Sequence, residues 1–434
     1  MERGGVCVEK IRVGVFGAFR GGVMAKALAA HPDAELVAVC DQHQPALEEV
    51  AKLAYKNGLT VALYENFEDF FRHDMDAVIL ANYANEHAPY AVRLLDSGRH
   101  VLSEVMPFET MAQAVALIEA VERSGRVYAY GENFCYMKGP MEMRRRYEAG
   151  ELGEVQYAEG EYVHDLISLW PHITYGDRHH WRNRIFPTFY CSHSLGPMIT
   201  ITGRRPVQVV GFETNYNNRL YNLEWGAVRV PMWACGALEM VTMDNGAVFK
   251  SLHNGLKRQP PSHNFQIYGT KGSMETDRFD SDNKLTAYTE RTGDKACNGK
   301  LETYDPVRVL SVKEAEVFTG HGGSDFYPTH FFLQKILGRE DGQKYSIDVY
   351  TAADIGSCGI LAYRSILGGN IPMRVPDLRD KRQREPYRHD HACTNPAVAG
   401  DQLLPVSPQY DVDSIPDEDF EQIRRLWLER RDLE

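Results

Sequence analysis

The sequence lacks any apolar run close to the roughly 20 residues that a helix needs to cross a bilayer. Its first residues also lack the apolar core of a secretory signal. No long Lys or Arg block is present, and the formal net charge is −12. Because phosphate contacts need clustered cations, we expect no nucleic-acid partner. These absences favour a cytoplasmic protein that does not bind membranes and acts on a small molecule.

Metal-ligand spacing is absent as well. The eight cysteines are scattered without a Cys-x-x-Cys pair or a zinc-like pattern, so we expect reduced, mostly structural thiols. The stretch 170–181 is rich in aromatic residues and histidines, with His172, His179 and His180. The side chains of adjacent residues such as His179 and His180 point in different directions on a helix or a strand, so they do not converge on one metal ion. We therefore predict no metal there and favour a sugar-stacking or lid loop.

The sequence does contain a strong alternation of short apolar runs with amphipathic stretches over its first 130 residues. This alternation is typical of βαβ units in a parallel sheet. A chain of 434 residues also exceeds what one hydrophobic core usually supports. We therefore predict an α/β protein whose N-terminal domain, residues 1–133, is a doubly wound parallel Rossmann sheet.

The pattern changes after Glu132, where strand-like segments with Gly-containing turns follow one another. Between them lie segments with the apolar spacing of helices, at 139–148, 193–202, 327–337 and 349–366. These segments predict an α+β domain over 134–375 with a mostly antiparallel, open-faced sheet. Residues 376–434 form a C-terminal extension, in which 417–431 is expected to be an amphipathic helix.

A glycine-rich turn follows the first predicted strand and indicates a dinucleotide site. Gly17 and Gly22 match the first and third positions of G-x-G-x-x-G, where the backbone approaches a pyrophosphate, but Phe19 occupies the second. Arg20 is a candidate to reach a phosphate. Asp41 closes the second strand, where an acidic side chain binds the adenosine ribose and disfavours a 2′-phosphate. We therefore predict NAD as the cofactor.

Three segments carry a family resemblance: IRVGVFGA, DAVILANYANEHAPYAVRLLDSGRHVLSEVMPF and IYGTKGSM. To about residue 375 the chain resembles the glucose-fructose oxidoreductase and inositol dehydrogenase family. The resemblance implies a Rossmann domain followed by an open-faced sheet, with NAD and a polyol or sugar between them. The further cofactor-binding residues that it implies are Asn82, Asn85, His87 and Glu104.

The chain departs from the dehydrogenases of that family at two positions. They usually carry a Glu-Lys-Pro element whose lysine assists proton transfer, whereas this chain has Glu104-Val105-Met106-Pro107. Their usual Asp-x-x-x-His pair is also altered, because Phe189 stands four residues before His193.

A narrower resemblance accounts for both departures. The segments GENFCYMKGPMEM, GELGEVQYAEGEYVHDL, HHWRNRIFPTFYCSHSLGP and GHGGSDF are similar to those of the family's NAD-dependent glycosidases, typified by the alpha-N-acetylgalactosaminidases. This resemblance implies an active site that contains Glu132, Tyr162, Arg182, Tyr190 and His193. It also implies substrate-binding roles for His321 and Asp325, although a plain turn with Ser324 or Asp325 as helix N-cap is an equal alternative.

The resemblance to these glycosidases implies a hidden redox cycle. The sugar is oxidised at C3, the C2 proton is lost, the leaving group at C1 is eliminated, water adds, and C3 is reduced again. His193 is our candidate base for the C3 hydroxyl, and Tyr162 for the C2 proton. Arg182 is a candidate to assist the Tyr162 phenol. Glu132 and Tyr190 are expected to orient sugar hydroxyls.

Two other functions stay open. One is an NAD-dependent sugar or inositol dehydrogenase that oxidises C3. The other is a non-catalytic NAD-binding regulator, which the absence of the expected lysine keeps open. In each case a small-molecule sugar or glycoside is the expected partner. A homodimer or homotetramer is expected by analogy, through the open face of the sheet.

Overall fold

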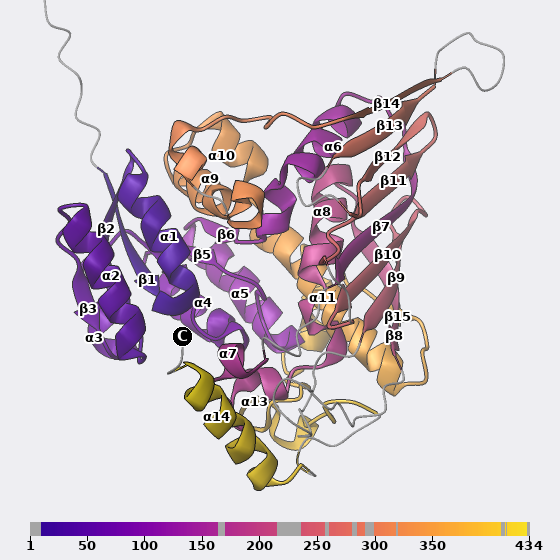
Figure 1. Cartoon of the computed structure of the whole chain (residues 1–434). Coiled ribbons are helices and arrows are strands. Elements are labelled where there is room, and N and C mark those ends of the chain that lie inside the picture. The colour runs from indigo at the N-terminus through magenta and orange to yellow at the C-terminus, as the bar shows by residue number, and fades with distance from the viewer. Residues whose placement is uncertain are drawn as a thin grey trace, which may run out of the picture. The chain divides into compact units, whose positions relative to one another are not determined.

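A computed structural model describes residues 10–163, 170–214, 236–256, 260–279, 284–290, 299–317, 320–408, 413 and 415–431. The chain divides into two compact units, each described here by itself (Figure 1). The first unit comprises Met1–Glu109, Gln113–Met137 and Leu310–Ala352. The second comprises Thr110–Ala112, Lys138–Val309 and Ala353–Glu434. Cys7, Cys235 and Cys297 lie outside the described residues, and the five other cysteines are buried free thiols.

The first unit is built on a six-stranded sheet with the order β3-β2-β1-β4-β5-β6, in which every pair is parallel. This order and direction are those of a doubly wound dinucleotide-binding sheet, as the sequence predicts. Its strands are β1 (Ile11–Phe16), β2 (Ala34–Cys40), β3 (Ala62–Tyr64), β4 (Ala77–Leu80), β5 (His100–Ser103) and β6 (Tyr128–Tyr130).

Helices of the first unit come from two distant parts of the chain. Apolar side chains of α1, α2 and α9 form one buried cluster with strands β1 and β2, so the segment after Leu310 contributes to this core. The helices are α1 (Ala18–Ala30), α2 (Gln44–Lys56), α3 (Phe67–Phe71), α4 (His87–Asp96), α5 (Met111–Ser124), α9 (Tyr327–Ile336) and α10 (Glu340–Tyr345). Short 3-10 turns are η1 (Ala84–Glu86), η2 (Asn133–Tyr136), η5 (Lys313–Val317) and η6 (Gly320–Phe326).

The second unit contains a nine-stranded sheet with the order β14-β13-β12-β11-β7-β10-β9-β8-β15. Its pairs are antiparallel except for β7 and β10, which confirms the predicted mostly antiparallel sheet. The strands are β7 (Val155–Val163), β8 (Pro206–Glu213), β9 (Ala237–Met243), β10 (Val248–Asn254), β11 (Phe265–Gly269), β12 (Gly272–Thr276), β13 (Leu285–Thr289), β14 (Lys300–Tyr304) and β15 (Met373–Arg374).

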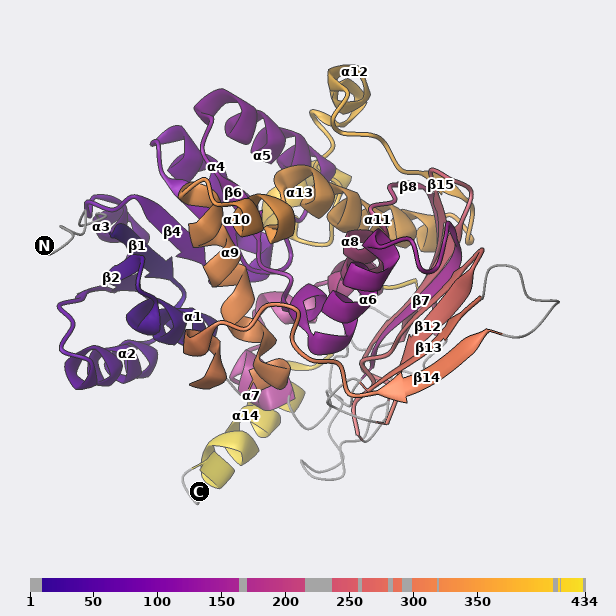
Figure 2. The same ribbon diagram turned by 90° about the horizontal axis from the view of Figure 1, so that it is seen from above.

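Helices cover one face of this sheet. Figures 1 and 2 show α6 (Lys138–Glu148), α8 (Ser192–Thr202) and α11 (Val349–Leu367) on the same side, and no described helix on the other. Helix α8 approaches β7 so closely that a Cβ on Gly160 would lie 1.9 Å from the carbonyl oxygen of Ser194. The uncovered face exposes Phe212 and Tyr268. The homodimer or homotetramer expected through this face stays a prediction.

The remaining short elements of the second unit are α7 (Trp170–Thr174), η3 (Trp181–Asn183), η4 (Pro187–Tyr190), α12 (Lys381–Arg384), η7 (Glu385–Tyr387), α13 (Pro396–Ala399), η8 (Gly400–Gln402) and α14 (Asp417–Arg431). The last of these confirms the terminal helix predicted from the sequence. None of the helices in the described part of the chain combines the length and the apolar character needed to span a bilayer.

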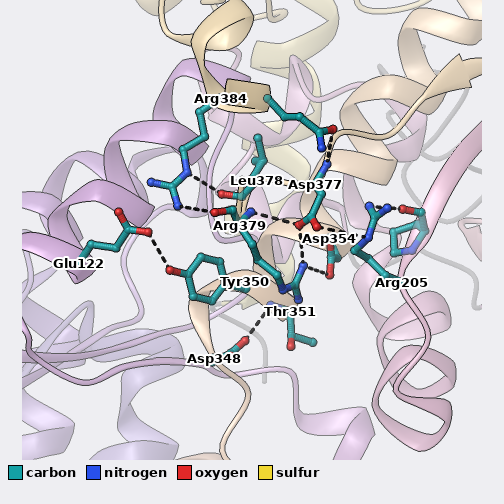
Figure 3. Close-up of polar contacts among 12 residues, drawn as sticks. Glu122, Arg205, Asp348, Tyr350, Thr351, Asp354, Asp377, Leu378, Arg379 and Arg384 are labelled. Atoms are coloured by element: carbon teal, nitrogen blue, oxygen red, sulfur yellow. Dashed lines mark hydrogen bonds and ion pairs between the residues drawn. The ribbon is translucent and has the colours of Figure 1, made fainter. Parts of the chain in front are cut away.

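The start of the C-terminal extension is held by a charged network (Figure 3). Arg379 pairs with the buried Asp354 of α11 at 2.9 Å, and Arg205 lies 3.9 Å from Asp377. Burial raises the pKa of Asp354 to about 7 despite its ion pair. The fully buried Arg384 donates to backbone carbonyls of Leu378 and Arg379. The segment after β15 is therefore an integral part of this unit.

Helix α14 packs on the aromatic segment that contains α7. Trp427 Nε1 donates to His172 Nδ1 at 3.0 Å, and Phe420 lies against Trp170 with ring centroids 6.1 Å apart. Arg178 pairs with Asp417 at 2.8 Å. The C-terminal helix thus supports the segment that leads to Arg182.

Candidate active site

The glycine turn of the first unit has the close backbone approach that a dinucleotide site needs. Gly17, the N-cap of α1, has φ +97°, and a Cβ there would lie 2.3 Å from the carbonyl carbon of Ala81. A Cβ on Gly21 would lie 2.5 Å from Val15, whereas Gly22 has open space around it. Gly21 therefore permits the helix–strand contact expected of a third glycine. The Phe19 side chain is 68% exposed and does not fill the turn.

Asp41 follows β2 directly, beside the first turn of α1. Its carboxylate accepts hydrogen bonds from the backbone N of Ala18 at 2.6 Å and of His43 at 2.8 Å. Backbone donors hold the acid at the end of β2, where an adenosine ribose is bound in this fold.

We expect the protein to bind NAD more tightly than NADP, because the Asp41 carboxylate repels a 2′-phosphate. In Asp41→Ala, the ratio of the NADP dissociation constant to the NAD dissociation constant should fall several-fold toward one, as measured by titration calorimetry. Glu35→Ala is the matched control, since it removes an exposed acid from the same strand and should leave the ratio unchanged. Equal affinities of the unaltered protein for both dinucleotides would contradict this assignment.

The segment after β4 offers polar atoms for a cofactor. The side-chain oxygens of Asn82 and Asn85 are buried and have no hydrogen-bond partner, which is costly for a polar atom unless a ligand supplies the partner. The ring nitrogens of His87 face the backbone oxygens of Met106 at 2.9 Å and Asn82 at 3.2 Å. Burial lowers the pKa of His87, and the ring supports the backbone of the site.

A buried charge network connects the glycine turn to the segment before α9. Arg20 donates to Glu104 at 2.8 Å and to Asp325 at 2.9 Å. Asp325 also accepts from Asn133 at 2.8 Å and contacts His321 Nδ1 at 2.9 Å. Burial raises the pKa of Asp325, but His321 and Arg20 outweigh it and hold that pKa below its usual range. Arg20 thus binds two carboxylates within this unit.

The alternative that Ser324 or Asp325 caps α9 is wrong. The N-cap is Phe326, with no side-chain cap, and Ser324 donates to the carbonyl of His321. The Asp325 carboxylate turns toward Arg20 and His321 because charged partners bind it more strongly than a helix N-terminus does. Glu132 also belongs to the first unit, where it is fully buried and accepts from the backbone N of Phe134 at 3.1 Å.

Four of the predicted residues come together in the second unit. Tyr162 of β7 and His193 of α8 meet edge to face, with ring centroids 4.5 Å apart. Tyr190 of η4 lies on another side of His193 at 5.4 Å. The guanidinium of Arg182 lies over the Tyr190 ring at 5.6 Å and over Trp181 at 4.5 Å. Two phenols, an imidazole and a guanidinium thus form one cluster, suited to proton transfer and to binding hydroxyl groups.

Two histidines missing from the sequence-based site also flank Tyr162. His253 is its register partner on β10 and is fully buried, and burial lowers the pKa of His253 to about 3. His263 lies on the other side of Tyr162, with ring centroids 5.9 Å apart and planes 13° from parallel. Neither histidine stands in a recognisable motif, so only strand pairing identifies them.

The histidines of the 170–181 segment have separate partners. His172 contacts Trp427, and His180 accepts from the backbone N of Arg182 at 3.2 Å. Burial and the Arg182 charge lower the pKa of His180 to about 3. Within the described ranges, no group of three or more His, Cys, Asp or Glu side chains is placed to hold a metal ion.

Comparisons with known proteins agree with both units. Residues 11–132 match the family model described as "Oxidoreductase family, NAD-binding Rossmann fold". Residues 234–384 match "Glycosyl hydrolase 109, C-terminal domain". The first match confirms the NAD prediction for the N-terminal domain.

Curated relatives that align with most of this chain are named glycosyl hydrolase family 109 proteins. "Glycosyl hydrolase family 109 protein 1" of Bacteroides thetaiotaomicron is 25% identical over 418 residues, which cover 89% of this chain and 88% of the relative. A "Glycosyl hydrolase family 109 protein" of Streptomyces filamentosus is 28% identical over 390 residues, which cover 85% of this chain and 77% of the relative.

Solved structures share the fold. An oxidoreductase from Agrobacterium radiobacter in complex with NAD⁺, L-tartaric acid and magnesium has a TM-score of 0.66 at 14% identity, covering 84% of this chain and 98% of that one. A levoglucosan dehydrogenase in complex with NADH and levoglucosan has a TM-score of 0.65 at 17% identity, covering 85% and 100%. The chain is therefore an oxidoreductase-fold enzyme whose residues 11–132 are similar to an NAD-binding Rossmann domain and whose residues 234–384 are similar to a glycosyl hydrolase 109 C-terminal domain.

Proposed function

We propose that the protein is a glycosidase that cleaves a small sugar glycoside by transient oxidation at C3, elimination and water addition. The observation that carries this proposal is the cluster of Tyr162, Tyr190 and His193, with rings 4.5 and 5.4 Å apart. It provides two separate proton-transfer groups, and such a cycle needs one at C3 and one at C2. The glycosyl hydrolase 109 match supports the same reading.

The residues of the first unit fit NAD. Gly17 permits close backbone approach, Asp41 suits the ribose, and the unpartnered oxygens of Asn82 and Asn85 can accept from the cofactor. When bound, NAD supplies the reversible hydride acceptance that oxidises C3 and later restores it.

We assign His193 to the proton of the C3 hydroxyl. An imidazole nitrogen can accept a proton and donate it again, so one residue can remove this proton during oxidation and return it at the end. The side chain is 7% exposed on α8, which shields the proton from exchange with bulk water.

We assign Tyr162 to the C2 proton. In this step the phenolate oxygen takes the proton, the C–H electron pair forms the new double bond to C1, and the leaving oxygen keeps the C1–O pair. Water then adds at C1, and C2 regains a proton from the phenol after the phenolic proton has exchanged with solvent. Tyr190 and Arg182, together with Glu132, His321 and Asp325, are proposed to bind and orient sugar hydroxyls.

A sugar dehydrogenase is the second candidate, because the oxidation at C3 would be the same. Levoglucosan dehydrogenase shares the fold, but that likeness extends to the fold alone. The residue next to Glu104 is Val105, so the lysine that dehydrogenases of the resembling family use is absent. This favours the glycosidase.

The fate of two hydrogens tests the proposal. Hydrolysis of a glycoside in heavy water should place deuterium at C2 of the released sugar, because a base removes the original proton and solvent replaces it. The C3 hydrogen should stay protium, since it returns to the same carbon within one turnover. NMR of the product measures both positions, and absorbance at 340 nm should show no net NADH.

A dehydrogenase would give the opposite pattern, with one NADH per sugar and a stable ketone. Released sugar without deuterium at C2 would contradict the elimination step. A panel of nitrophenyl glycosides, followed through nitrophenol and NADH together, identifies the sugar and anomer to be used.

A further inference from the structure

The proposed cleavage includes a proton transfer that neither Tyr162 nor His193 performs. When water adds at C1, its oxygen bonds to carbon and must lose a proton to a base. Tyr162 is assigned to the C2 proton, and the buried His193 is assigned to the C3 hydroxyl. The addition step therefore needs a third proton acceptor, and water must be able to reach it.

His321 and Asp325 form a hydrogen-bonded pair within the first unit. Nδ1 of His321 lies 2.9 Å from Oδ2 of Asp325 in the turn η6. The Asp325 side chain is buried, whereas the His321 side chain is 42% exposed. His321 has φ +48°, a left-handed conformation that is uncommon outside glycine. Residues in such sparsely populated conformations cluster at active sites.

The pair determines which nitrogen of His321 can accept a proton. Burial raises the pKa of Asp325, but its hydrogen bond with His321 and the charge of Arg20 hold that pKa below its usual range. The carboxylate is therefore ionised and only accepts hydrogen bonds. In a neutral His321 the proton must then lie on Nδ1, which leaves the lone pair on Nε2. The aspartate of a Ser-His-Asp triad orients its imidazole in the same way.

Further hydrogen bonds hold the pair at the carboxyl edge of the parallel sheet. Asp325 accepts from Arg20 at 2.9 Å and from Asn133 at 2.8 Å. Arg20 lies in the first turn of α1 after β1, and Asn133 follows β6. Arg20 also donates to Glu104, which comes directly after β5. Ligands of doubly wound sheets bind outside the carboxyl ends of the strands, so His321 lies at the edge where NAD is expected.

We propose that His321 is a third catalytic base of the glycosidase, whose Nε2 takes a proton from the water that adds at C1 while Asp325 orients the ring. This inference rests on the proposed function and goes beyond the hydroxyl-binding role given there. The water oxygen bonds to C1 and its proton goes to Nε2, while the electron pair of the C1–C2 double bond takes the proton of the Tyr162 phenol. The imidazolium then releases its proton to solvent, and the expelled leaving oxygen takes one from solvent.

His321→Asn tests this step, because asparagine tolerates the left-handed conformation and its amide is no base. With a nitrophenyl glycoside, the first turnover should still release one nitrophenol per enzyme, because oxidation and elimination precede water addition. Later turnovers should slow about 100-fold or more, the usual scale for loss of a general base. NADH should accumulate at 340 nm, since C3 is reduced only after water has added. Rapid mixing measures all three quantities.

Azide provides a second readout. This anion attacks carbon without losing a proton, so it should restore turnover in His321→Asn and give a glycosyl azide, which mass spectrometry identifies. The matched control is His73→Asn. His73 is a half-buried histidine of the same unit that contacts the Tyr64 hydroxyl at 2.9 Å and precedes β4, at the opposite edge of the sheet. Its first and later turnovers should equal those of the unaltered protein.

The outcomes separate the inference from the proposed function. Unchanged steady-state turnover in His321→Asn would overturn the inference. Equal losses of the first and later turnovers, without rescue by azide, would also overturn it, because they indicate a binding or structural role. Sugar released by the unaltered protein without deuterium at C2 would instead contradict the proposed function, and the inference would fall with it.

Discussion

Replacing His193 with Ala is expected to lower kcat at least 100-fold, the usual scale for loss of a general acid or base. The imidazole contacts both Tyr162 and Tyr190, so its removal takes away the group assigned to the C3 hydroxyl proton. NAD affinity should stay within a few-fold, because the cofactor residues lie in the other unit. Steady-state kinetics and calorimetry measure the two quantities separately.

Tyr162→Phe should have an effect of similar size, since it keeps the ring contact with His193 and removes only the hydroxyl. The matched control is Tyr157→Phe on the same strand. Tyr157 points to the opposite face of the sheet, where it donates to Glu159 at 2.8 Å, so kcat should not change. Normal turnover in either His193→Ala or Tyr162→Phe would remove that residue from the mechanism.

Gly160→Ala should destabilise the second unit strongly. The new Cβ would lie 1.9 Å from the Ser194 carbonyl oxygen, and this neighbour is backbone that cannot rotate away. Overpacking of this kind costs roughly 1–3 kcal/mol. The melting temperature of this unit should fall by roughly 2–4 °C for each kcal/mol lost. Because Ser194 follows His193, helix α8 must move and kcat should fall as well.

Gly22→Ala is the stability control, because a Cβ there meets nothing within 4 Å and the position is helical. Alanine favours a helix over glycine, so the first unit should not lose stability. Calorimetric scans of both variants make the comparison. A Gly160→Ala protein that melts like the unaltered one would show that α8 can withdraw from β7 without cost.

Much of the fold follows from local sequence patterns. The βαβ alternation of the first 130 residues predicts the parallel sheet, and periodicity predicts α6, α8, α9, α11 and α14 to within one or two residues. Local patterns fail where an element is short or irregular in composition. Strand β3 has three residues, and β10 (Val248–Asn254) contains Lys250, Ser251 and His253, which conceal its alternation.

The glycosidase resemblance likewise implied candidate residues, and the structure brings Tyr162, Tyr190, His193 and Arg182 together. The glycine turn and Asp41 could also be predicted from the sequence, because a strand, a tight turn and an acidic residue at the end of the next strand are local features. The sequence by itself therefore determined the two kinds of domain, and the candidate-site residues stay a prediction that rests on the resemblance.

Only the tertiary structure decided which distant segments meet. Residues 310–352 join the first unit because α9 buries its apolar side chains against α1 and the parallel sheet. Arg20 binds Glu104 and Asp325, residues far away in the chain, because a buried cation needs carboxylate partners. His253 and His263 flank Tyr162 through strand register, which depends on long-range backbone pairing that no local pattern specifies.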